Sequence, residues 1–173
     1  MQHNRSGRGY ESLPRSGRKF EGFEIRRADP ADMAGVVELC SKHAAHERMN
    51  YDPAGKRETL TQAIFEASKL ICIVAATSQR HRSGIAGYAT CMSQYSTWLT
   101  TEYLYMDCLY VEAECRGFGI GKRLMQAVAE EAVKLGYAEV QWQTPDFNEQ
   151  AKQFYDSVEG TSRYSKLRYT WQL

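Results

Sequence analysis

The sequence of 173 residues has no long hydrophobic run. Its longest apolar stretch, residues 70–76, is far shorter than the roughly 20 residues that a membrane-spanning helix requires. The N-terminal segment MQHNRSGRGYES also lacks the apolar centre of a secretory signal. The sequence therefore predicts a cytoplasmic protein with no membrane partner.

Cysteine patterns that hold metals or disulfides are missing as well. The five cysteines are odd in number and widely spaced, without a Cys-x-x-Cys pair, so neither a disulfide framework nor a zinc site is expected. Free cysteines of this kind are most often small core residues. Cys115 stands beside Arg116 in a predicted loop, where a thiolate is favoured, but no paired histidine is evident. No metal cofactor is expected.

Neither sign of charge is in excess, since 22 Lys and Arg face 21 Asp and Glu for a net charge of +1. Residues 1–19 hold five cations and one carboxylate (+4), which leaves 17 cations and 20 carboxylates (−3) in the remainder. This basic segment is rich in Arg, Gly and Ser without hydrophobic periodicity, which predicts a disordered tail. A tail so short is more often simply solvated than bound to an acidic partner, and nucleic acid is not expected as a partner.

Residues 20–173 are predicted to form one domain, with 43% hydrophobic residues in the whole chain, as is typical of globular proteins. Expected strands are 23–27, 70–76, 85–92, 102–111, 138–143 and 166–171, and expected helices are 33–46, 57–68, 121–135 and 148–157. The fold class is α/β with the order β-α-α-β-β-β-α-β-α-β and one mixed sheet. The strands that flank helix 121–135 should be parallel, and that unit should carry the ligand site.

A glycine-rich loop with the sequence RGFGIGKR occupies residues 116–123, between a predicted strand and a predicted helix. Alternating glycines let successive N–H groups converge on one point, and the helix N-terminus adds its positive end. Arg116 on one side and Lys122 with Arg123 on the other add charge, which favours a diphosphate. The spacing fits neither a Walker loop, which needs G-x4-G-K-[ST], nor a Rossmann fingerprint, which needs G-x-G-x-x-G.

This loop resembles the pyrophosphate signature [Q/R]-x-x-G-x-[G/A] of the GNAT superfamily of acetyl-CoA-dependent N-acetyltransferases. Three further motifs match in order: I-R-x-A-x-P-x-D at 25–32, Leu-Tyr-Val at 109–111, and N-x-x-A-x-x-F-Y at 148–155. The resemblance covers about residues 22–171 and is nearest to the branch of fungal histone, polyamine and diamine acetyltransferases. In one departure, Gly160 comes one residue later than usual after Tyr155 and is followed by Thr161.

The resemblance implies a GNAT-type sheet whose central parallel strands splay apart after residues 109–111, where strand backbone binds the pantetheine arm of acetyl-CoA. The N–H of Leu109 or Tyr110 is the candidate oxyanion donor. Tyr155 shares a helix face with Asn148 and is implied to protonate the leaving CoA thiolate. The expected cofactor-binding residues are Leu109, Tyr110, Val111, Arg116, Gly117, Phe118, Gly119, Ile120, Gly121, Lys122, Asn148 and Tyr155.

An acceptor amine must lose a proton before it attacks, so a base is needed near the end of strand 102–111. Strand alternation predicts that Tyr103, Tyr105, Asp107 and Leu109 share one face. In the resembling diamine acetyltransferases a glutamate stands at the position of Asp107. Asp107 is therefore the first candidate for catalytic base or amine anchor and Glu102 the second, although Asp107 is equally able to pair only with a neighbouring backbone group or cation.

The acceptor site is expected at the end of helix 33–46 and in the turn that follows. The candidate substrate-binding residues are His46, Glu47, Tyr51, Trp98, Tyr105 and Asp107. His43 and His46 have the spacing to ligate a metal with Glu47, but a solvated helix end is the favoured interpretation. The aromatic side chains suit a cationic amine or, equally, the surface of a homodimer.

These observations predict an acetyl-CoA-dependent N-acetyltransferase that acts on a primary amine of a small molecule by direct attack in a ternary complex. A polyamine, an amino sugar, an aminoglycoside-like compound and an amino acid all qualify as acceptors, and the acidic body of the protein favours a cationic one. Two alternatives stay open: acetylation of a protein lysine or N-terminus, and a non-catalytic acyl-CoA-binding module.

Overall fold

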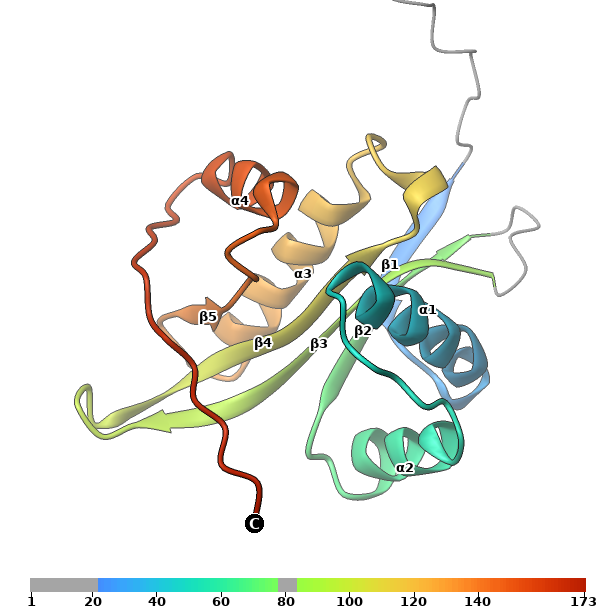
Figure 1. Ribbon diagram of the computed structural model, residues 1–173, viewed down its shortest axis with the longest axis horizontal. Helices are drawn as coiled ribbons and strands as arrows, with labels where there is room; N and C mark the ends of the chain where they lie inside the picture. Colours follow the sequence, from blue (N-terminus) through green and yellow to red (C-terminus); the bar gives the residue numbers. More distant parts are fainter. Residues whose placement is uncertain (1–21, 78–83) are drawn as a thin grey trace, which may run out of the picture.

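The computed structural model describes residues 22–77 and 84–173, so the predicted basic tail at 1–19 lies outside the described residues. The described residues form a five-stranded sheet, and Figure 1 shows helices on both of its faces, which confirms the predicted α/β class. The strands are β1 (Phe23–Arg27), β2 (Ile71–Thr77), β3 (Ile85–Ser96), β4 (Thr101–Val111) and β5 (Val140–Trp142), and the helices are α1 (Met33–His46), α2 (Lys56–Thr61), α3 (Ile120–Lys134) and α4 (Glu149–Asp156). Among the described residues, no helix is both long and apolar enough to cross a bilayer.

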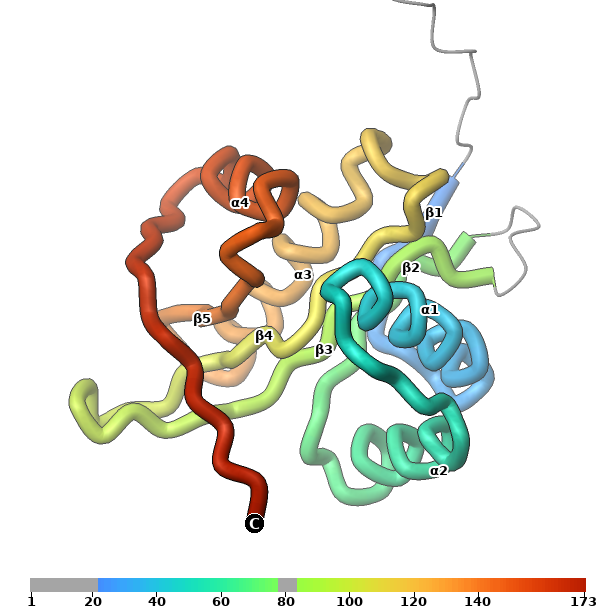
Figure 2. The backbone as a smooth tube through the Cα atoms, in the orientation of Figure 1, coloured from blue at the N-terminus to red at the C-terminus, as the bar shows by residue number. Residues whose placement is uncertain are grey.

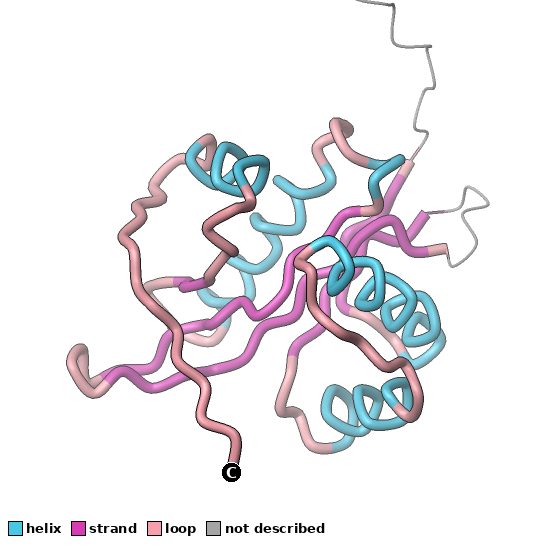
Figure 3. The backbone as a smooth tube through the Cα atoms, viewed as in Figure 1, coloured by secondary structure: helices cyan, strands magenta, loops and turns pink. Residues whose placement is uncertain are grey.

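The sheet has the order β1-β2-β3-β4-β5. Neighbours from β1 to β4 are antiparallel, whereas β4 and β5 are parallel and joined through α3. This confirms the prediction of a parallel pair around a crossover helix. Short turns complete the chain path: η1 (Pro30–Asp32) before α1, the π-helical segment η2 (Gln62–Glu66) after α2, and η3 (Ala113–Cys115) before α3. The helical and strand segments are distinguished in Figure 3.

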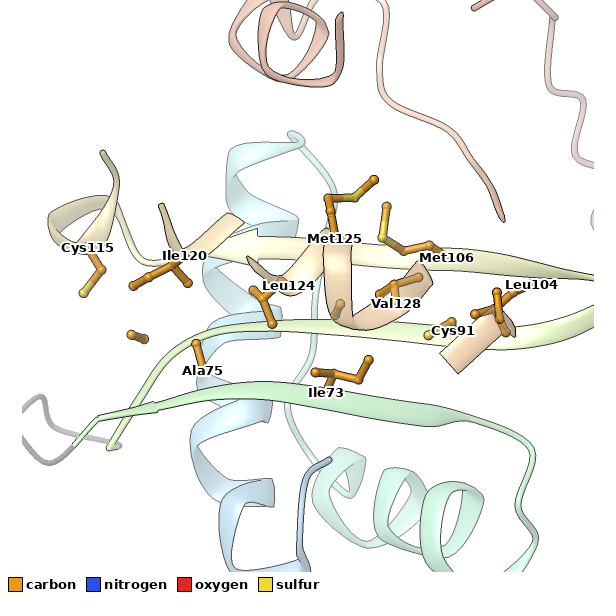
Figure 4. Close-up of a cluster of buried hydrophobic side chains, with 13 residues drawn as sticks. Ile73, Ala75, Cys91, Leu104, Met106, Cys115, Ile120, Leu124, Met125 and Val128 are labelled. Carbon is orange, nitrogen blue, oxygen red and sulfur yellow. The ribbon is translucent and has the colours of Figure 1, made fainter. Parts of the chain in front are cut away.

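Two apolar cores fill the space between the sheet and its helices. Leu124 and Val128 of α3 are fully buried against Ile73 of β2 and Leu104 of β4, as Figure 4 shows. On the opposite face, the α1 side chains pack with Tyr88 of β3. Burying side chains of this size is the main favourable term in folding, and it holds the sheet between α3 and the α1–α2 pair.

Polar contacts fix the start of α1 and the end of α3. The side chain of Asp29 accepts from the N–H of Ala31, while Asp32 accepts from the N–H of Asp29, so the two form a capping box. Glu131 of α3 is 5% exposed and pairs with both Arg27 of β1 and Lys134. The Arg27–Glu131 pair ties β1 to α3, and an ion pair of Arg26 with Asp32 at 2.6 Å ties β1 to the start of α1.

β4 carries a bulge in its centre. Thr90 of β3 pairs with Cys108 and the next residue, Cys91, pairs with Met106, so Asp107 is an extra residue of β4 between the two pairs. A bulge adds one residue to one strand, kinks it and reverses its side-chain alternation.

The bulge changes which side chains of β4 share a face. Met106 packs against α3, and after the bulge Leu109 takes that same face. Tyr110 turns to the α1 side of the sheet. The prediction that Leu109 shares a face with Tyr105 is therefore wrong, because strict alternation holds only where the register is unbroken.

The splay of β4 and β5 starts earlier than predicted. Their pairing joins residues 104–106 to residues 140–142 and ends at Met106 and Trp142. The second half of β4, from Asp107 to Val111, continues beyond the end of β5. The structure therefore confirms splayed parallel strands, but the separation begins at the bulge rather than after residues 109–111.

The strand predicted at residues 166–171 does not form. Residues 161–173 have no regular secondary structure, and Figure 2 shows them as an extended run to the C-terminus. Leu167, Tyr169 and Trp171 are more than 80% exposed. β-branched and aromatic residues favour strands only when a neighbouring strand supplies hydrogen bonds and packing, and this segment has neither among the described residues.

Candidate active site

A pocket of about 350 Å³ lies where β4 extends beyond β5. Its walls are the second half of β4, the loop between η3 and α3, the start of α4 and the end of α1. Fourteen of the residues predicted for the site line it: His46, Glu47, Asp107, Leu109, Tyr110, Val111, Arg116, Gly117, Gly119, Ile120, Gly121, Lys122, Asn148 and Tyr155. The pocket therefore joins the predicted donor and acceptor sites in one space.

The glycine-rich loop forms one end of this pocket. Gly117 has φ of 85° and Gly119 has φ of 81°, values that side chains other than glycine rarely adopt. Gly119 is also the N-cap of α3, a helix of 15 residues. Backbone N–H groups at such a helix start, together with the positive end of the helix dipole, make this loop suited to bind phosphate.

The cations around the loop differ in their roles. The Nε atom of Arg116 donates to the carbonyl of Val111 at 3.0 Å, and its guanidinium lies over the ring of Tyr110 at 5.4 Å from the centroid. Lys122 lines the pocket. Arg123 instead lies over the ring of Phe23, 4.8 Å from its centroid, so the prediction that it accompanies Lys122 at the anion is wrong.

α4 presents Asn148 and Tyr155 to the pocket, as predicted. Asn148 caps α4, with its Oδ1 accepting from the N–H of Ala151 at 3.0 Å, so its amide NH2 is the group left for a ligand. The ring of Tyr155 packs against Trp142 with 5.2 Å between centroids. Burial raises the pKa of Tyr155 to about 12, and its hydroxyl therefore keeps its proton at neutral pH.

The opposite wall is acidic and contains a histidine pair. Asp107 and Glu47 both line the pocket. Nε2 of His43 is 3.3 Å from Oε1 of Glu47, and its Nδ1 is 3.2 Å from the Tyr88 hydroxyl. Burial lowers the pKa of His43, which favours the neutral imidazole. Within the described part of the chain, no three metal-binding side chains come together.

Several predicted residues lie outside the pocket. Glu102 is near the β3–β4 turn, where it accepts from the Tyr137 hydroxyl at 3.4 Å. It precedes Asp107 by five residues, about 16 Å along a strand. Trp98 is 95% exposed in the same turn, and Phe118 is 41% exposed. The structure thus separates Glu102 and Trp98 from the site, because the β3–β4 hairpin extends well beyond the helices (Figure 1). Phe118 belongs to the glycine-rich loop, between Gly117 and Gly119, which line the pocket, although Phe118 itself does not.

Two predicted tyrosines also do not line the pocket. Tyr105 stands on β4 before the bulge and its side chain is half-buried. The hydroxyl of Tyr51 is buried and forms no hydrogen bond within the described residues. Burial and the nearby Cys40 thiol raise its pKa to about 12. Tyr51 therefore lies beside Cys40 of α1 and does not line the cavity.

Sequence reasoning missed part of the lining. Met106, Trp142 and Phe154 form apolar parts of the wall, and His43 reaches it from α1. The spacing of His43 and Glu47, four residues apart on a helix, could have shown that they meet. Cys115 also lines the pocket, but burial raises the pKa of its thiol to about 11, so a thiolate is not favoured there.

Comparisons with known proteins show which family has a similar sequence. Residues 37–159 match the model of the acetyltransferase (GNAT) family. Thialysine N-epsilon-acetyltransferase of Sus scrofa is 28% identical over 139 residues, which cover 78% of this chain and 81% of that protein. The D-amino-acid N-acetyltransferase HPA3 of Saccharomyces cerevisiae is 25% identical over 134 residues, with 78% and 82% covered.

Solved structures share the fold at lower identity. An aminoglycoside acetyltransferase, meta-AAC0020 from an uncultured soil metagenomic sample, superposes with a TM-score of 0.73 at 21% identity and covers 87% of this chain and 96% of its own. A Bacillus halodurans C-125 protein described as a transcriptional regulator has the same TM-score at 19% identity, with 87% and 100% covered. At these identities the likeness shows the fold alone.

Proposed function

This chain belongs to the GNAT acetyltransferase family and takes acetyl-CoA as its acyl donor, and we propose that it acetylates the primary amine of a small cationic molecule by direct attack in a ternary complex. The observation that carries the proposal is the pocket itself. It runs from the anion-binding loop at α3, past Tyr155, to the carboxylates of Glu47 and Asp107. A thioester and an amine can therefore be held in line within one cavity.

The donor end fits acetyl-CoA, which supplies an activated acetyl group. In this proposal the N–H groups of the loop at 117–121 and the ammonium of Lys122 bind the diphosphate. The free edge of β4 beyond the bulge offers backbone groups to the pantetheine arm. The amide of Asn148 adds a hydrogen bond there. Arg116 stiffens the loop through its bonds to Val111 and Gln150, which use two of the five N–H groups of its guanidinium.

At the reacting centre, each step has a group in place. The N–H of Leu109 or Tyr110 is assigned to the developing charge on the thioester oxygen. The hydroxyl of Tyr155, which keeps its proton, gives that proton to the departing CoA thiolate. The carboxylate of Asp107, at the bulge, takes the proton that the amine must lose.

The acceptor is assigned to the class of small amines that carry a second charged group, or the polar groups of an amino acid, besides the amine that is acetylated. Thialysine N-epsilon-acetyltransferase and the yeast D-amino-acid N-acetyltransferase, both named for amino-acid amines, resemble this chain over more than three quarters of its length. Two carboxylates facing the cavity, Glu47 and Asp107, favour such a cation. This supports placing the chain near the diamine and fungal polyamine branch.

An acceptor screen tests the proposal. Purified protein is mixed with acetyl-CoA and, separately, with a polyamine, thialysine, ornithine, a D-amino acid, an aminoglycoside and a lysine peptide, and released CoA is measured as free thiol. We expect turnover with at least one small amine. Turnover with the peptide alone would assign a protein substrate instead, and acetyl-CoA binding by calorimetry without any turnover would assign a non-catalytic module.

A truncation separates the predicted tail from the predicted catalytic domain at 20–173. Removing residues 1–19 should leave the KM for the small amine and kcat unchanged, because the pocket residues all lie in the remaining domain. A loss of small-amine turnover on truncation would contradict this division of the chain.

A further inference from the structure

His43 is held on three sides inside the acceptor wall. Its side chain is 13% exposed although it belongs to the last turn of α1. Its ring stacks on Tyr110 of β4, with 5.2 Å between centroids and 29° between planes. Its two nitrogens meet the Tyr88 hydroxyl of β3 and the carboxylate of Glu47 at opposite ends. The ring is thus fixed by residues from three elements.

The partners also determine where its proton lies. An ionised carboxylate can only accept a hydrogen bond, so the nitrogen that faces Glu47, Nε2, must carry the hydrogen. Burial raises the pKa of the Tyr88 phenol far above its usual value, so this group keeps its proton and donates to Nδ1. The result is a directed chain of two hydrogen bonds, from the Tyr88 hydroxyl to Nδ1 and from Nε2–H to Glu47.

The end of this chain faces the reacting centre. Glu47 lines the pocket beside Asp107, and its charge, after burial, is the main influence that raises the pKa of Tyr155. Glu47 and the Tyr155 hydroxyl proposed to protonate CoA therefore belong to the same cavity. A carboxylate fixed there, with one oxygen bound by His43, offers the other oxygen to an ammonium ion.

We propose that His43 is the positioning residue of the acceptor site, which holds the Glu47 carboxylate by its Nε2–H so that Glu47 binds the ammonium of the amine substrate. This inference rests on the proposed amine acetyltransferase function and adds a specific arrangement to it. His43 itself does not touch the amine. It acts by holding the Glu47 carboxylate in one rotamer. Without this bond, a flexible glutamate at a helix end would turn its carboxylate into solvent.

The arrangement carries a pH dependence of its own. The charged and titratable groups that face His43 are Glu47 and His46 from α1, Tyr88 from β3, and Asp107 and Tyr110 from β4. When His43 gains a proton, a positive charge stands 3.3 Å from Glu47 and cancels much of its attraction for an ammonium. The KM for the amine should therefore rise as the pH falls below the usual histidine value of about 6.5.

Two substitutions test this with different chemistry. His43→Phe keeps a ring against Tyr110 but removes both nitrogens, and we expect the KM for the amine to rise about ten-fold, the equivalent of one charge-assisted hydrogen bond. His43→Gln keeps an N–H donor near the Nε2 position but cannot titrate. We expect its KM at pH 7.5 to stay within about three-fold of the wild-type value and the rise toward pH 5.5 to disappear.

Controls separate this role from a structural one. The dissociation constant of acetyl-CoA, measured by calorimetry, should be the same in every variant. Glu38→Gln removes a carboxylate from the same helix outside the pocket, where Glu38 pairs with Lys42, and its KM for the amine should equal that of the wild type. If His43→Phe does not fold, the pH profile of His43→Gln decides the question alone.

The outcomes distinguish a failure of the proposed acetyltransferase function from a failure of the role assigned to His43. If the wild type acetylates no amine, the proposed function is wrong and this inference falls with it. If the wild type acetylates an amine but both His43 variants keep its KM and its pH profile, the function stands and the role of His43 is refuted. If His43→Phe and His43→Gln raise the KM for the amine equally, and the pH profile does not change, a positioning role is likewise refuted.

Discussion

Gly87 of β3 is the position where one added methyl group should disturb the active site most directly. A Cβ atom there would lie 2.8 Å from the carbonyl oxygen of Tyr110 and 3.3 Å from both the Cα of Val111 and the Cδ1 of Leu124. The first distance is shorter than side chains tolerate, and the atom it meets is backbone. Because Gly87 pairs with Val111 in the β3–β4 ladder, the Gly87→Ala protein must move β4 itself.

The magnitude follows from the kind of clash. Overpacking of this type costs about 1–3 kcal/mol, and each kcal/mol lowers Tm by about 2–4 °C in a chain of this size. We therefore expect Tm to fall by about 2–12 °C in differential scanning calorimetry. The shift also moves Tyr110 and Val111, whose edge is assigned to the pantetheine arm. We expect the dissociation constant of acetyl-CoA to rise about ten-fold, since misplacement of binding groups by 1 Å has large effects.

Gly136→Ala is the matched control, because it should lower the stability of the protein without moving the strands of the active site. Gly136 follows α3 with φ of 79° and has open space around its Cα, so alanine costs about 1–2 kcal/mol of backbone strain but moves no strand. Acetyl-CoA should bind this variant as it binds the wild type. Unchanged affinity and unchanged Tm in Gly87→Ala would refute the close approach of β3 and β4 on which the prediction depends.

Three further predictions concern catalysis, pH and the core. Tyr155→Phe should lower kcat about 100-fold, as expected for loss of a general acid, with acetyl-CoA affinity unchanged by calorimetry; wild-type kcat would contradict that role. Glu131→Gln should lower the free energy of unfolding by about 1–2 kcal/mol at pH 7. Arg27 and Lys134 lower the pKa of Glu131, so its contribution to stability is present above the usual glutamate pKa of about 4.3 and is lost as the pH falls through the lowered value. Urea denaturation should therefore show that the free energy of unfolding decreases less between pH 7 and pH 3 in the variant than in the wild type. Leu124→Ala, at a fully buried site, should cost about 2–5 kcal/mol in the same assay, and a smaller loss would mean that α3 repacks.

Much of the fold could be predicted because its signals are local. Asp29 followed by Pro30 is a typical helix start, and with the apolar residues that follow it predicts α1 near its observed position, while residues 116–121 predict the turn before α3. These signals depend on a few neighbouring residues and their backbone preferences. The strand predicted at 166–171 shows the limit of such signals, since its aromatic side chains favour a strand, but no strand in residues 22–77 or 84–173 pairs with it.

The candidate site was predictable in its donor half and only in part on its acceptor side. The loop glycines, Asn148 and Tyr155 were identified through their motifs and all line the pocket. Glu102 and Trp98 were wrongly included because alternation and proximity in sequence say nothing about how far a hairpin extends past its helices. His43 was expected in the region of the acceptor site, at a solvated helix end or as a metal ligand, and its bond to Tyr88 was missed because Tyr88 is 45 residues away.

The sequence by itself therefore determined the strand–loop–helix unit with its positive-φ glycines at 117 and 119, because the geometry that binds a diphosphate is encoded within consecutive residues. It also determined that the chain has no cysteine pattern for a metal or disulfide site. Tertiary structure alone decided where β4 leaves β5, because the bulge at Asp107 exists only against the register of β3. It also decided that Tyr88, His43 and Glu47 meet, because three elements must pack before their polar atoms come within hydrogen-bond distance.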